Sequence, residues 1–347
     1  MIKIREITDK NIWNTFVTSL NDYTFLQSWE WGEVQKTLQE KVWRLGLFDQ
    51  NKLTGVCLAL TLSTKRGKIL FVPHGPLFKK WTDNNFKTIV DYLKPLAQKN
   101  NCLCLRISPL IEDDKNLRNL FKRLGFQDAP AVMHAEDTWF VNPAGSEEEI
   151  LAKMRKTTRN LVRRGERENI TITQSVNLTD AEILDKLQTE TVKRNAFVPF
   201  SKKFLLTLMQ EFFQDNKAAL FLGKFDNDIT AAALIVFFGK IAFYYVSGSK
   251  ETKAPVNYLL QWEVIKEARK RGATVYNMWG IAPPNKHHHP WQGLTMFKTG
   301  FGGFAKNYLH AQDLPISLKY WPFYLTEKIP KVWRERLGKL VGKFTLF

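Results

Sequence analysis

The chain contains 347 residues, of which 44% are hydrophobic and 24% are charged, a composition that allows two folded domains with ordinary cores. Its 51 basic and 34 acidic residues give a net charge of +17, which favours a polyanionic partner such as nucleic acid, anionic lipid or a phosphorylated ligand. Three cysteines cannot form a disulfide framework, and the longest apolar run, residues 231–238, is too short to cross a bilayer. We therefore expect a cytoplasmic protein that at most contacts the inner face of the plasma membrane.

The first half of the chain predicts three consecutive strands, then a helix and one more strand. Apolar runs separated by turn residues place these elements, in chain order, at 42–48, 53–62, 68–73, 83–99 and 102–107. The second half predicts the same order of elements, at 219–225, 229–238, 241–246, 257–271 and 274–279. This order is typical of α+β folds and of N-acetyltransferase-like (GNAT-like) domains.

Short motifs recur between the two halves at a nearly constant separation of 176 or 177 residues. The motif LGLFD at 45–49 returns as LGKFD at 222–226, LFKRLGF at 120–126 as MFKTGF at 296–301, and HAED at 134–137 as HAQD at 310–313. A single repeat of this length indicates a whole domain rather than one unit of a solenoid. We therefore predict two tandem GNAT-like domains related by internal duplication, at 1–145 and 169–347, the second ending in a basic and aromatic tail.

Residues 146–168 are predicted to form one basic helix that connects these domains. Apolar residues recur on one of its faces, and Arg155, Lys156, Arg159 and Arg163 lie on the remainder. These four cations are candidates for contact with tRNA or with other phosphates. A solvated helix surface is the opposing interpretation, because acids at the start of a helix and bases near its end also suit the helix dipole.

The richest stretch of candidate site residues follows the last predicted strand. Asn277 and Trp279 end this strand, a proline-rich loop follows, and Phe297 and Lys298 come just before a glycine-rich segment. Loops that follow strand ends often carry functional side chains. The equivalent loop of the first half, residues 109–114, is shorter and acidic, so the two halves differ most where a site is expected.

Signatures of several other site types are missing from the sequence. It has neither a nucleotide-binding P-loop nor a nucleophile elbow, and the glycines at 300–303 lack the pattern of a coenzyme A pyrophosphate loop. The adjacent histidines at 287–289 point in different directions and have no second ligand group at a useful spacing. We expect no metal and no resident cofactor.

Taken together, these features resemble the FemABX family of peptidoglycan bridge-forming aminoacyltransferases, which are built from two GNAT-like domains. The resemblance covers nearly the whole chain and is carried by FLQSWEW at 25–31, PHGPL at 73–77, KMRKTTR at 153–159, ETVKRN at 190–195, YYVSGS at 244–249 and FKTGF at 297–301. Some members have a long coiled-coil arm. Residues 147–169 are too short for one, so the chain resembles an armless member, related to lipid II:glycine glycyltransferases.

The resemblance implies a function. Family members transfer an amino acid from aminoacyl-tRNA, as co-substrate, to an amine of the stem peptide of a peptidoglycan precursor. The acceptor is lipid II or UDP-MurNAc-pentapeptide. Both substrates are polyanions, which agrees with the net charge of +17.

The resemblance also implies roles for individual residues. Lys298 matches a lysine that stabilises charge on the reacting carbonyl, and Phe297 would help to place the tRNA acceptor end. Lys36 and Arg194 fall where the family binds precursor phosphates, and Tyr245 falls where a tyrosine lines the peptide channel. The remaining candidates for substrate binding are Trp31, Arg106, Tyr244, Asn277 and Trp279.

The sequence also leaves alternatives open. Ser108 stands where several family members have an aspartate, so the general base is unassigned among Glu112, Asp113, Asp114, a substrate phosphate and water. Lys298 has a competing interpretation as a surface helix lysine, because Lys122 occupies its place in the first repeat. An acyl-coenzyme A-dependent N-acyltransferase and a non-catalytic tRNA- or lipid-binding relative remain as alternative functions.

Overall fold

The computed structural model describes residues 2–64, 66–194, 199–284, 286 and 288–329. Contacts between Cα atoms divide these residues into two compact units. Unit 1 contains the described residues of 1–23, 39–134 and 308–347, and unit 2 contains those of 24–38 and 135–307. Most of the predicted tail, from residue 330 onward, lies outside the described residues.

Unit 1 is built on a mixed sheet with the strand order β1-β2-β3-β4-β6-β15-β7, in which β5 also pairs with β3. All neighbours are antiparallel except β4 and β6, which run parallel. The strands are β1 (Lys3–Glu6), β2 (Val42–Asp49), β3 (Lys52–Thr64), β4 (Gly67–Pro73), β5 (Leu77–Phe78), β6 (Cys104–Ser108), β7 (Gln127–Asp128) and β15 (Gln312–Pro315). The helices are α1 (Lys10–Thr18), α3 (Asp83–Lys99), α4 (Lys115–Arg123) and α11 (Tyr320–Lys328).

The core of unit 1 lies between this sheet and α3. The Thr82 hydroxyl caps the start of α3, and its buried residues follow a helical spacing that turns one apolar face inward. Phe86 and Leu93 on that face pack with Leu105 of β6 and with other alternate strand residues. Since neighbouring residues of a strand point to opposite faces, Arg106 lies on the sheet face away from α3.

Unit 2 is built on a second mixed sheet with the order β14-β8-β13-β12-β11-β10-β9, in which only β12 and β13 run parallel. The strands are β8 (Asp137–Val141), β9 (Ile170–Ser175), β10 (Ala218–Phe225), β11 (Asp228–Phe238), β12 (Ile241–Ser249), β13 (Val275–Gly280) and β14 (Phe304–Asn307). The helices are α2 (Trp29–Thr37), α5 (Glu147–Lys153), α6 (Lys156–Arg167), α7 (Ala181–Arg194), α8 (Lys202–Phe213), α9 (Val256–Lys270) and α10 (Gln292–Thr299), with short 3₁₀ turns at Phe25–Gln27 and Leu178–Asp180.

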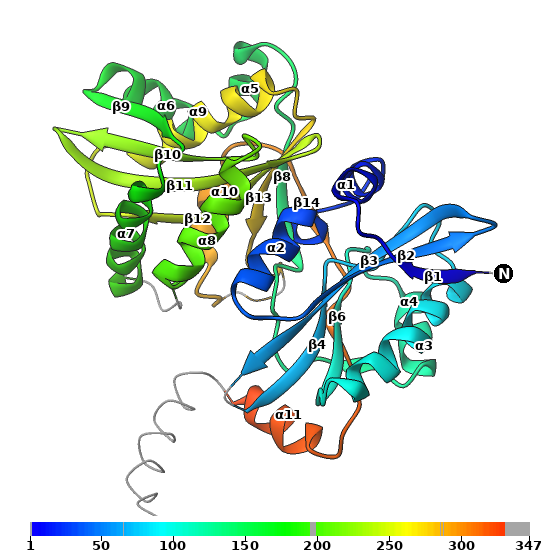
Figure 1. Ribbon diagram of the computed structural model, residues 1–347. Coiled ribbons are helices and arrows are strands. Elements are labelled where there is room, and N and C mark those ends of the chain that lie inside the picture. Colours follow the sequence, from blue (N-terminus) through cyan, green and yellow to red (C-terminus); the bar gives the residue numbers. More distant parts are fainter. Residues whose placement is uncertain (1, 65, 195–198, 285, 287, 330–347) are drawn as a thin grey trace, which may run out of the picture. The chain divides into compact units, whose positions relative to one another are not determined.

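Helices cover both faces of the sheet of unit 2 (Figure 1). Alternate residues of β10 and β11, including Phe221 and Ile235, pack against Leu260 and Ile265 of α9, and Val162 of α6 joins the same core. The opposite face receives α7 and α8. The central strands β10 and β11 are therefore buried on both sides, as their nearly continuous apolar sequences indicate.

The two units repeat the same order of elements, as the sequence motifs predict. Three antiparallel strands, β2-β3-β4 or β10-β11-β12, lead into a long helix, α3 or α9. The next strand, β6 or β13, then pairs in parallel with the third strand of its own unit. The observed bounds differ from the predicted ones by up to three residues.

The strand that follows each repeat pairs with the sheet of the other repeat. β8 follows the first repeat in the chain but pairs with β13 in unit 2, and β15 follows the second repeat but pairs with β6 in unit 1. These strands begin at or near the aspartates of the recurring HA-x-D motif, Asp137 and Asp313. The contact-based units therefore differ from the predicted domains 1–145 and 169–347. The segment 24–38, which carries α2, also belongs to unit 2.

The segment predicted as one connecting helix at 146–168 forms two helices. Ser146 and Glu149 make a reciprocal capping box at the start of α5. Met154 and Arg155 then adopt extended backbone angles, and the Arg155 N–H donates to the carbonyl of Gly300 instead of continuing a helix. The apolar spacing of the sequence was compatible with one helix because Met154, Thr158 and Val162 are buried on a common side.

Candidate active site

The site in unit 2 begins where β12 and β13 stop pairing. Their parallel register covers only the pairs from Ile241–Val275 to Phe243–Asn277, although both strands continue beyond this point. Tyr244 and Tyr245 follow immediately on β12, and Trp279 and Gly280 follow on β13. Where two neighbouring parallel strands stop pairing and separate, a ligand can approach the backbone between their ends.

The backbone of β13 is irregular at this point. Its register with β8 shifts between Asn277 and Gly280, and Trp279 has a φ angle of +65°. Such an angle is unfavourable for a bulky residue and needs local support. Asn277 supplies it, because its side-chain oxygen accepts a 2.8 Å hydrogen bond from the Trp279 N–H. Asn277 is buried, and its amide oxygen stabilises the backbone at this strand end. We predicted that Asn277 binds substrate directly; the contact seen here is structural.

Lys298 extends from α10 into this strand end. Only 4% of its surface is exposed, and Nζ donates a 2.6 Å hydrogen bond to the carbonyl oxygen of Gly280. Nζ also lies 5.6 Å from the centre of the Tyr244 ring, whose hydroxyl donates to Ser247 Oγ at 2.7 Å. Lys122, the corresponding lysine of the first repeat, is exposed on α4. The interpretation as a surface lysine therefore fits Lys122 and not Lys298.

The electrostatic state of Lys298 follows from this burial. Loss of hydration lowers its pKa from 10.5 to about 7. Within the described residues its contacts are a carbonyl dipole and an aromatic face, with no ion pair to a carboxylate. A buried ammonium of this kind is strongly stabilised when a negative charge develops beside it.

An aromatic cluster lies next to the lysine within unit 2. Phe25 is completely buried and contacts Tyr245, Trp279 and Trp31, with ring centres 4.8, 5.7 and 5.7 Å away. Further members of the cluster are Phe200, Phe204, Phe212 and Phe243. The Trp31 N–H is buried and has no acceptor among the described residues, so the cluster holds one unused hydrogen-bond donor. Burial also raises the pKa of Tyr244 and Tyr245, which keeps both phenols neutral.

The glycine-rich segment after α10, the helix that carries Lys298, packs closely against α6 and β8. A Cβ atom at Gly300 would lie 2.2 Å from Thr158 Oγ1, and one at Gly303 would lie 1.9 Å from the carbonyl oxygen of Phe140. Gly302 and Gly303 also have positive φ angles. Glycine is required here for close packing and backbone conformation. The half-buried Phe297 ring contacts Tyr258 and Phe301, so it lies in the packing around α10.

The four basic candidates at the start of and within α6 divide into two pairs. Arg155 donates to Thr299 Oγ1 and to the carbonyl of Met296, which ties it to the end of α10. Arg159 donates to carbonyls of Leu151 and Ala152 at the end of α5. Lys156 and Arg163, seven residues apart, are exposed and make no side-chain hydrogen bond within the described part of the chain. They are therefore the pair free to contact phosphate.

Arg155 also borders a cavity of about 350 Å³ in unit 2. Its lining includes Pro283, Lys286, Gln292 and Thr295, which come from the proline-rich loop and from α10. Two other predicted phosphate contacts lie at helix ends. Lys36 lies in the last turn of α2 and pairs with Glu33 at 3.1 Å, and the exposed Arg194 ends α7 and donates to the carbonyl of Ser249.

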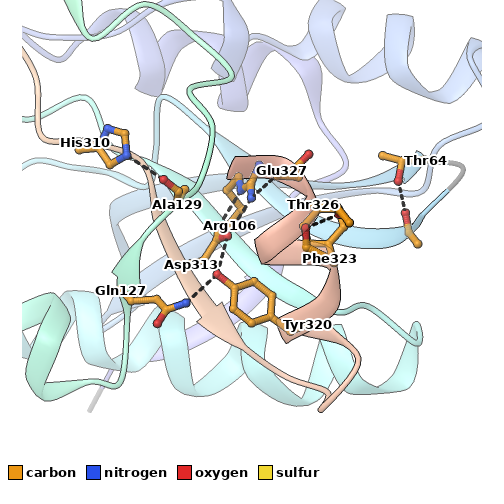
Figure 2. Close-up of polar contacts among 11 residues, drawn as sticks. Thr64, Arg106, Gln127, Ala129, His310, Asp313, Tyr320, Phe323, Thr326 and Glu327 are labelled. Carbon is orange, nitrogen blue, oxygen red and sulfur yellow. Dashed lines mark hydrogen bonds and ion pairs between the residues drawn. The ribbon is translucent and has the colours of Figure 1, made fainter. Parts of the chain in front are cut away.

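Arg106 occupies a different environment from the one predicted. It is completely buried in unit 1, where it makes a two-pronged ion pair with Asp313 at 2.7 and 2.8 Å and contacts Glu327 at 3.0 Å. Figure 2 shows these contacts together with Tyr320, whose hydroxyl donates to Asp313 at 3.0 Å and accepts from Gln127. The prediction that Arg106 binds substrate is wrong for this structure, because both partners are internal carboxylates and no surface is exposed.

The acidic loop of unit 1 also separates into distinct roles. Asp113 pairs with Arg118, and Asp114 caps the start of α4 through backbone N–H groups. Glu112 is exposed, and its backbone forms an isolated bridge with Tyr308. Ser108 is buried and pairs in register with Pro73. Of the three carboxylates considered as a base, Glu112 alone has no structural task in the described residues.

Two features of the site were not predicted from the sequence. The carbonyl of Gly280 carries no side-chain signal, although the Trp-Gly end of a strand marks its position. Phe25 and Phe204 come from segments far apart in the sequence, and their aromatic character was the available signal. Among the described residues, no group of three His, Cys, Asp or Glu side chains could hold a metal, and His287 lies outside them.

Known proteins resemble this chain in sequence and in fold. A family model described as the FemAB family matches residues 8–228 and 224–328. A lipid II:glycine glycyltransferase of Staphylococcus epidermidis is 20% identical over 95% of this chain and 97% of its own length. A crystal structure of FemX superposes with a TM-score of 0.80 at 18% identity, covering 94% of this chain and 100% of that chain. A tandem GNAT protein from the clavulanic acid biosynthesis pathway has a TM-score of 0.55 at 7% identity, covering 91% and 99% of the two chains.

The fold and these similarities define a protein of two tandem GNAT-like domains, which confirms the predicted fold class. The chain belongs to the FemAB family, as the sequence resemblance predicts. No helix in the described part of the chain has the length and apolar character needed to cross a membrane.

Proposed function

We propose that this protein transfers an amino acid from aminoacyl-tRNA to an amine of the stem peptide of a peptidoglycan precursor, the step that forms an interpeptide bridge. Membership of the FemAB family and similarity to a lipid II:glycine glycyltransferase support this reaction. Within the site, the observation that carries the proposal is the buried, uncompensated Lys298 at the divergence of β12 and β13.

The chemistry assigns Lys298 a specific task. The acceptor amine attacks the ester carbonyl of the aminoacyl group, and the resulting tetrahedral centre carries an oxyanion. Collapse of this centre breaks the bond to the ribose oxygen and forms an amide, while a proton passes overall from the amine to the released ribose hydroxyl. A protonated Lys298 placed at the oxyanion would stabilise it in a site from which water is largely excluded.

The surrounding residues position the lysine and provide cations for the two substrates. The carbonyl of Gly280 orients the lysine, and the buried aromatic cluster supports the strand ends beside it. We propose that Lys156 and Arg163 contact phosphates of the tRNA, and that Lys36 and Arg194 contact phosphates of lipid II or UDP-MurNAc-pentapeptide. Phosphate contacts of this kind make binding strongly dependent on salt.

We also propose that the reaction takes place in the cytoplasm, with peripheral contact at the inner face of the plasma membrane, and that aminoacyl-tRNA is the only co-substrate. An N-acyltransferase that uses acyl-coenzyme A is less favoured, because the family match extends over nearly the whole chain and the pyrophosphate loop is missing. A non-catalytic relative would not need a buried lysine that has no carboxylate partner among the described residues.

The test is a transfer assay with a total pool of charged tRNA that carries radiolabelled amino acids. UDP-linked and lipid-linked muramyl pentapeptide are offered separately as acceptors. We expect label in at least one acceptor, and the labelled amino acid identifies the donor. Binding of charged tRNA without any transfer would instead favour a binding protein, and transfer from acyl-coenzyme A would favour the N-acyltransferase.

A further inference from the structure

The outer face of α11 in unit 1 exposes a stripe of apolar side chains. Leu318 just before the helix, Trp321 and Leu325 are 88%, 48% and 64% exposed. Their spacing of three and four residues places them on one side of the helix. Pro322 beside them is also exposed. We call these four residues the α11 stripe.

The inner face of the same helix is anchored to the sheet of unit 1. Tyr320 and Phe323 are buried, and Glu327 reaches Arg106 at 3.0 Å (Figure 2). Asp313 of β15 joins both, because it accepts from Arg106 and from the Tyr320 hydroxyl. A buried, charge-assisted network of this kind fixes the orientation of the helix. The α11 stripe is therefore a surface held in place by the sheet.

The exposed charged residues of segment 318–328 are both lysines. Lys319 and Lys328 are exposed at the two ends of the helix. The acidic residue of the segment, Glu327, is turned inward and neutralised by Arg106, with its side chain only 14% exposed. The outer face consequently combines aliphatic and indole groups with cations, and carries no carboxylate between residues 318 and 328.

We propose that the α11 stripe is the surface by which this protein docks on an anionic lipid bilayer. Aliphatic groups and tryptophan enter the boundary between headgroups and acyl chains, while lysines at the edge meet lipid phosphates. Two of the exposed groups are leucines, which have no flat surface for stacking on bases, so RNA is a poorer match. A helix of nine residues is only about 13 Å long, so it lies in the interface instead of crossing it.

This inference deepens the proposed function, because a bilayer-docked transferase meets a lipid-linked acceptor at the membrane surface. It can nevertheless fail independently. Transfer to a UDP-linked acceptor in solution needs no bilayer, and vesicle binding needs no catalysis. Measuring both on the same proteins separates the two proposals.

The experiment is co-sedimentation of the full chain with sucrose-loaded vesicles of phosphatidylcholine containing phosphatidylglycerol, and with vesicles of phosphatidylcholine alone. Leu318→Gln/Leu325→Gln removes both leucines without changing the rings of α11, and Trp321→Gln/Leu325→Gln removes the indole and one leucine. Ile12→Gln/Val176→Gln is the matched control, since Ile12 and Val176 are 54% and 57% exposed elsewhere. Thermal melting of each variant checks that the fold is retained.

We expect the wild-type protein and the control to bind phosphatidylglycerol vesicles, more weakly at high salt, and both stripe variants to lose binding about tenfold or more. Transfer to the lipid-linked acceptor in vesicles should fall in parallel, while transfer to the UDP-linked acceptor stays unchanged. Equal vesicle binding by the folded stripe variants and the wild type would overturn the proposal, and so would a wild-type protein that does not bind the vesicles. Binding of tRNA lost from the stripe variants would assign the surface to RNA instead.

Discussion

Lys298 donates a 2.6 Å hydrogen bond to the backbone carbonyl of Gly280, and this contact joins α10 to the irregular end of β13. The carbonyl belongs to the residue directly after Trp279, whose unusual φ angle turns the strand away from its regular path. The strand irregularity therefore presents an acceptor to the lysine, and the glycines after α10 allow the helix to approach closely enough to reach it. A small change in either element would displace the ammonium.

Replacing Lys298 tests its place in the reaction. We expect Lys298→Ala to lower kcat for amino acid transfer by about 10²- to 10³-fold, the usual effect of losing one oxyanion contact. Affinity for charged tRNA should change little. Lys122→Ala, the matched change in the first repeat, should leave transfer unaffected because that lysine is exposed. Full activity of Lys298→Ala would remove the lysine from the mechanism.

The pH dependence of kcat/KM distinguishes a cationic from a basic role for Lys298. Its pKa is lowered to about 7 by burial, so the ammonium form disappears as the pH rises through 7. If the cation is required, the ratio of wild-type to Lys298→Arg kcat/KM should fall across this range, since arginine stays charged. A ratio that rises through pH 7 would instead identify neutral Lys298 as a proton acceptor.

The same burial predicts how stability depends on pH. An unfolded lysine titrates near 10.5 and the folded one near 7, so the unfolded state holds more protons between these values. The free energy of unfolding should therefore rise as the pH increases from about 7 to about 10, by about 1.4 kcal/mol for each unit of pKa difference that is titrated. Lys298→Met should remove this part of the slope.

Urea unfolding of wild type and Lys298→Met at several pH values measures the effect. The difference between their midpoints should be greatest near pH 7, with the methionine variant the more stable, and should shrink toward pH 10. Parallel pH profiles for the two proteins would mean that the lysine is hydrated in solution.

The ion pair between Arg106 and Asp313 should be essential for the stability of unit 1. Asp313→Ala leaves a buried guanidinium without its two-pronged partner, which should cost about 3–5 kcal/mol. Arg106→Ala should cost a similar amount, and the double variant should cost less than the sum. Arg118→Ala breaks a pair with Asp113 in which Arg118 is 62% exposed, and should cost no more than about 1 kcal/mol. Additive losses in the urea midpoints would argue against a coupled network.

The two free cations of α6 should contribute to tRNA affinity in a salt-dependent way. Lys156→Ala and Arg163→Ala should each weaken binding and reduce the slope of log K against log salt by about one. Lys87→Ala, which removes an exposed lysine paired with Asp91 in unit 1, is the control. An unchanged salt slope in the α6 variants would mean that this surface is only solvated.

Much of the fold follows from local sequence, because strands and helices in each repeat have continuous apolar patterns and clear turn residues. The predicted helix at 83–99 coincides with α3, since Thr82 caps it and its apolar spacing is regular. The break between α5 and α6 was not predictable in this way. It depends on the hydrogen bond between Arg155 and Gly300, two residues far apart in the chain.

In the site, too, local sequence predicted some features, while others depend on contacts between distant residues. Lys298 was identified by resemblance and by the recurring FK motif, but sequence alone could not decide between a surface and a buried lysine. Burial depends on the path of β13, which the structure supplies. Arg106 was misjudged for the corresponding reason. Its acidic partners, Asp313 and Glu327, lie more than 200 residues away, so no local pattern marked the arginine as internal.

The exchange of β8 and β15 has a consequence for how this chain can be made and divided. A polypeptide that ended after the first repeat would carry β8 without β13, and its own β6 would lack β15. During synthesis, the strand pairing of unit 1 is therefore complete only after residues 312–315, near the end of the described chain, have been made. Two separately produced halves would each present unpaired strand edges, and we expect them to recover a native arrangement only by trading these strands with each other.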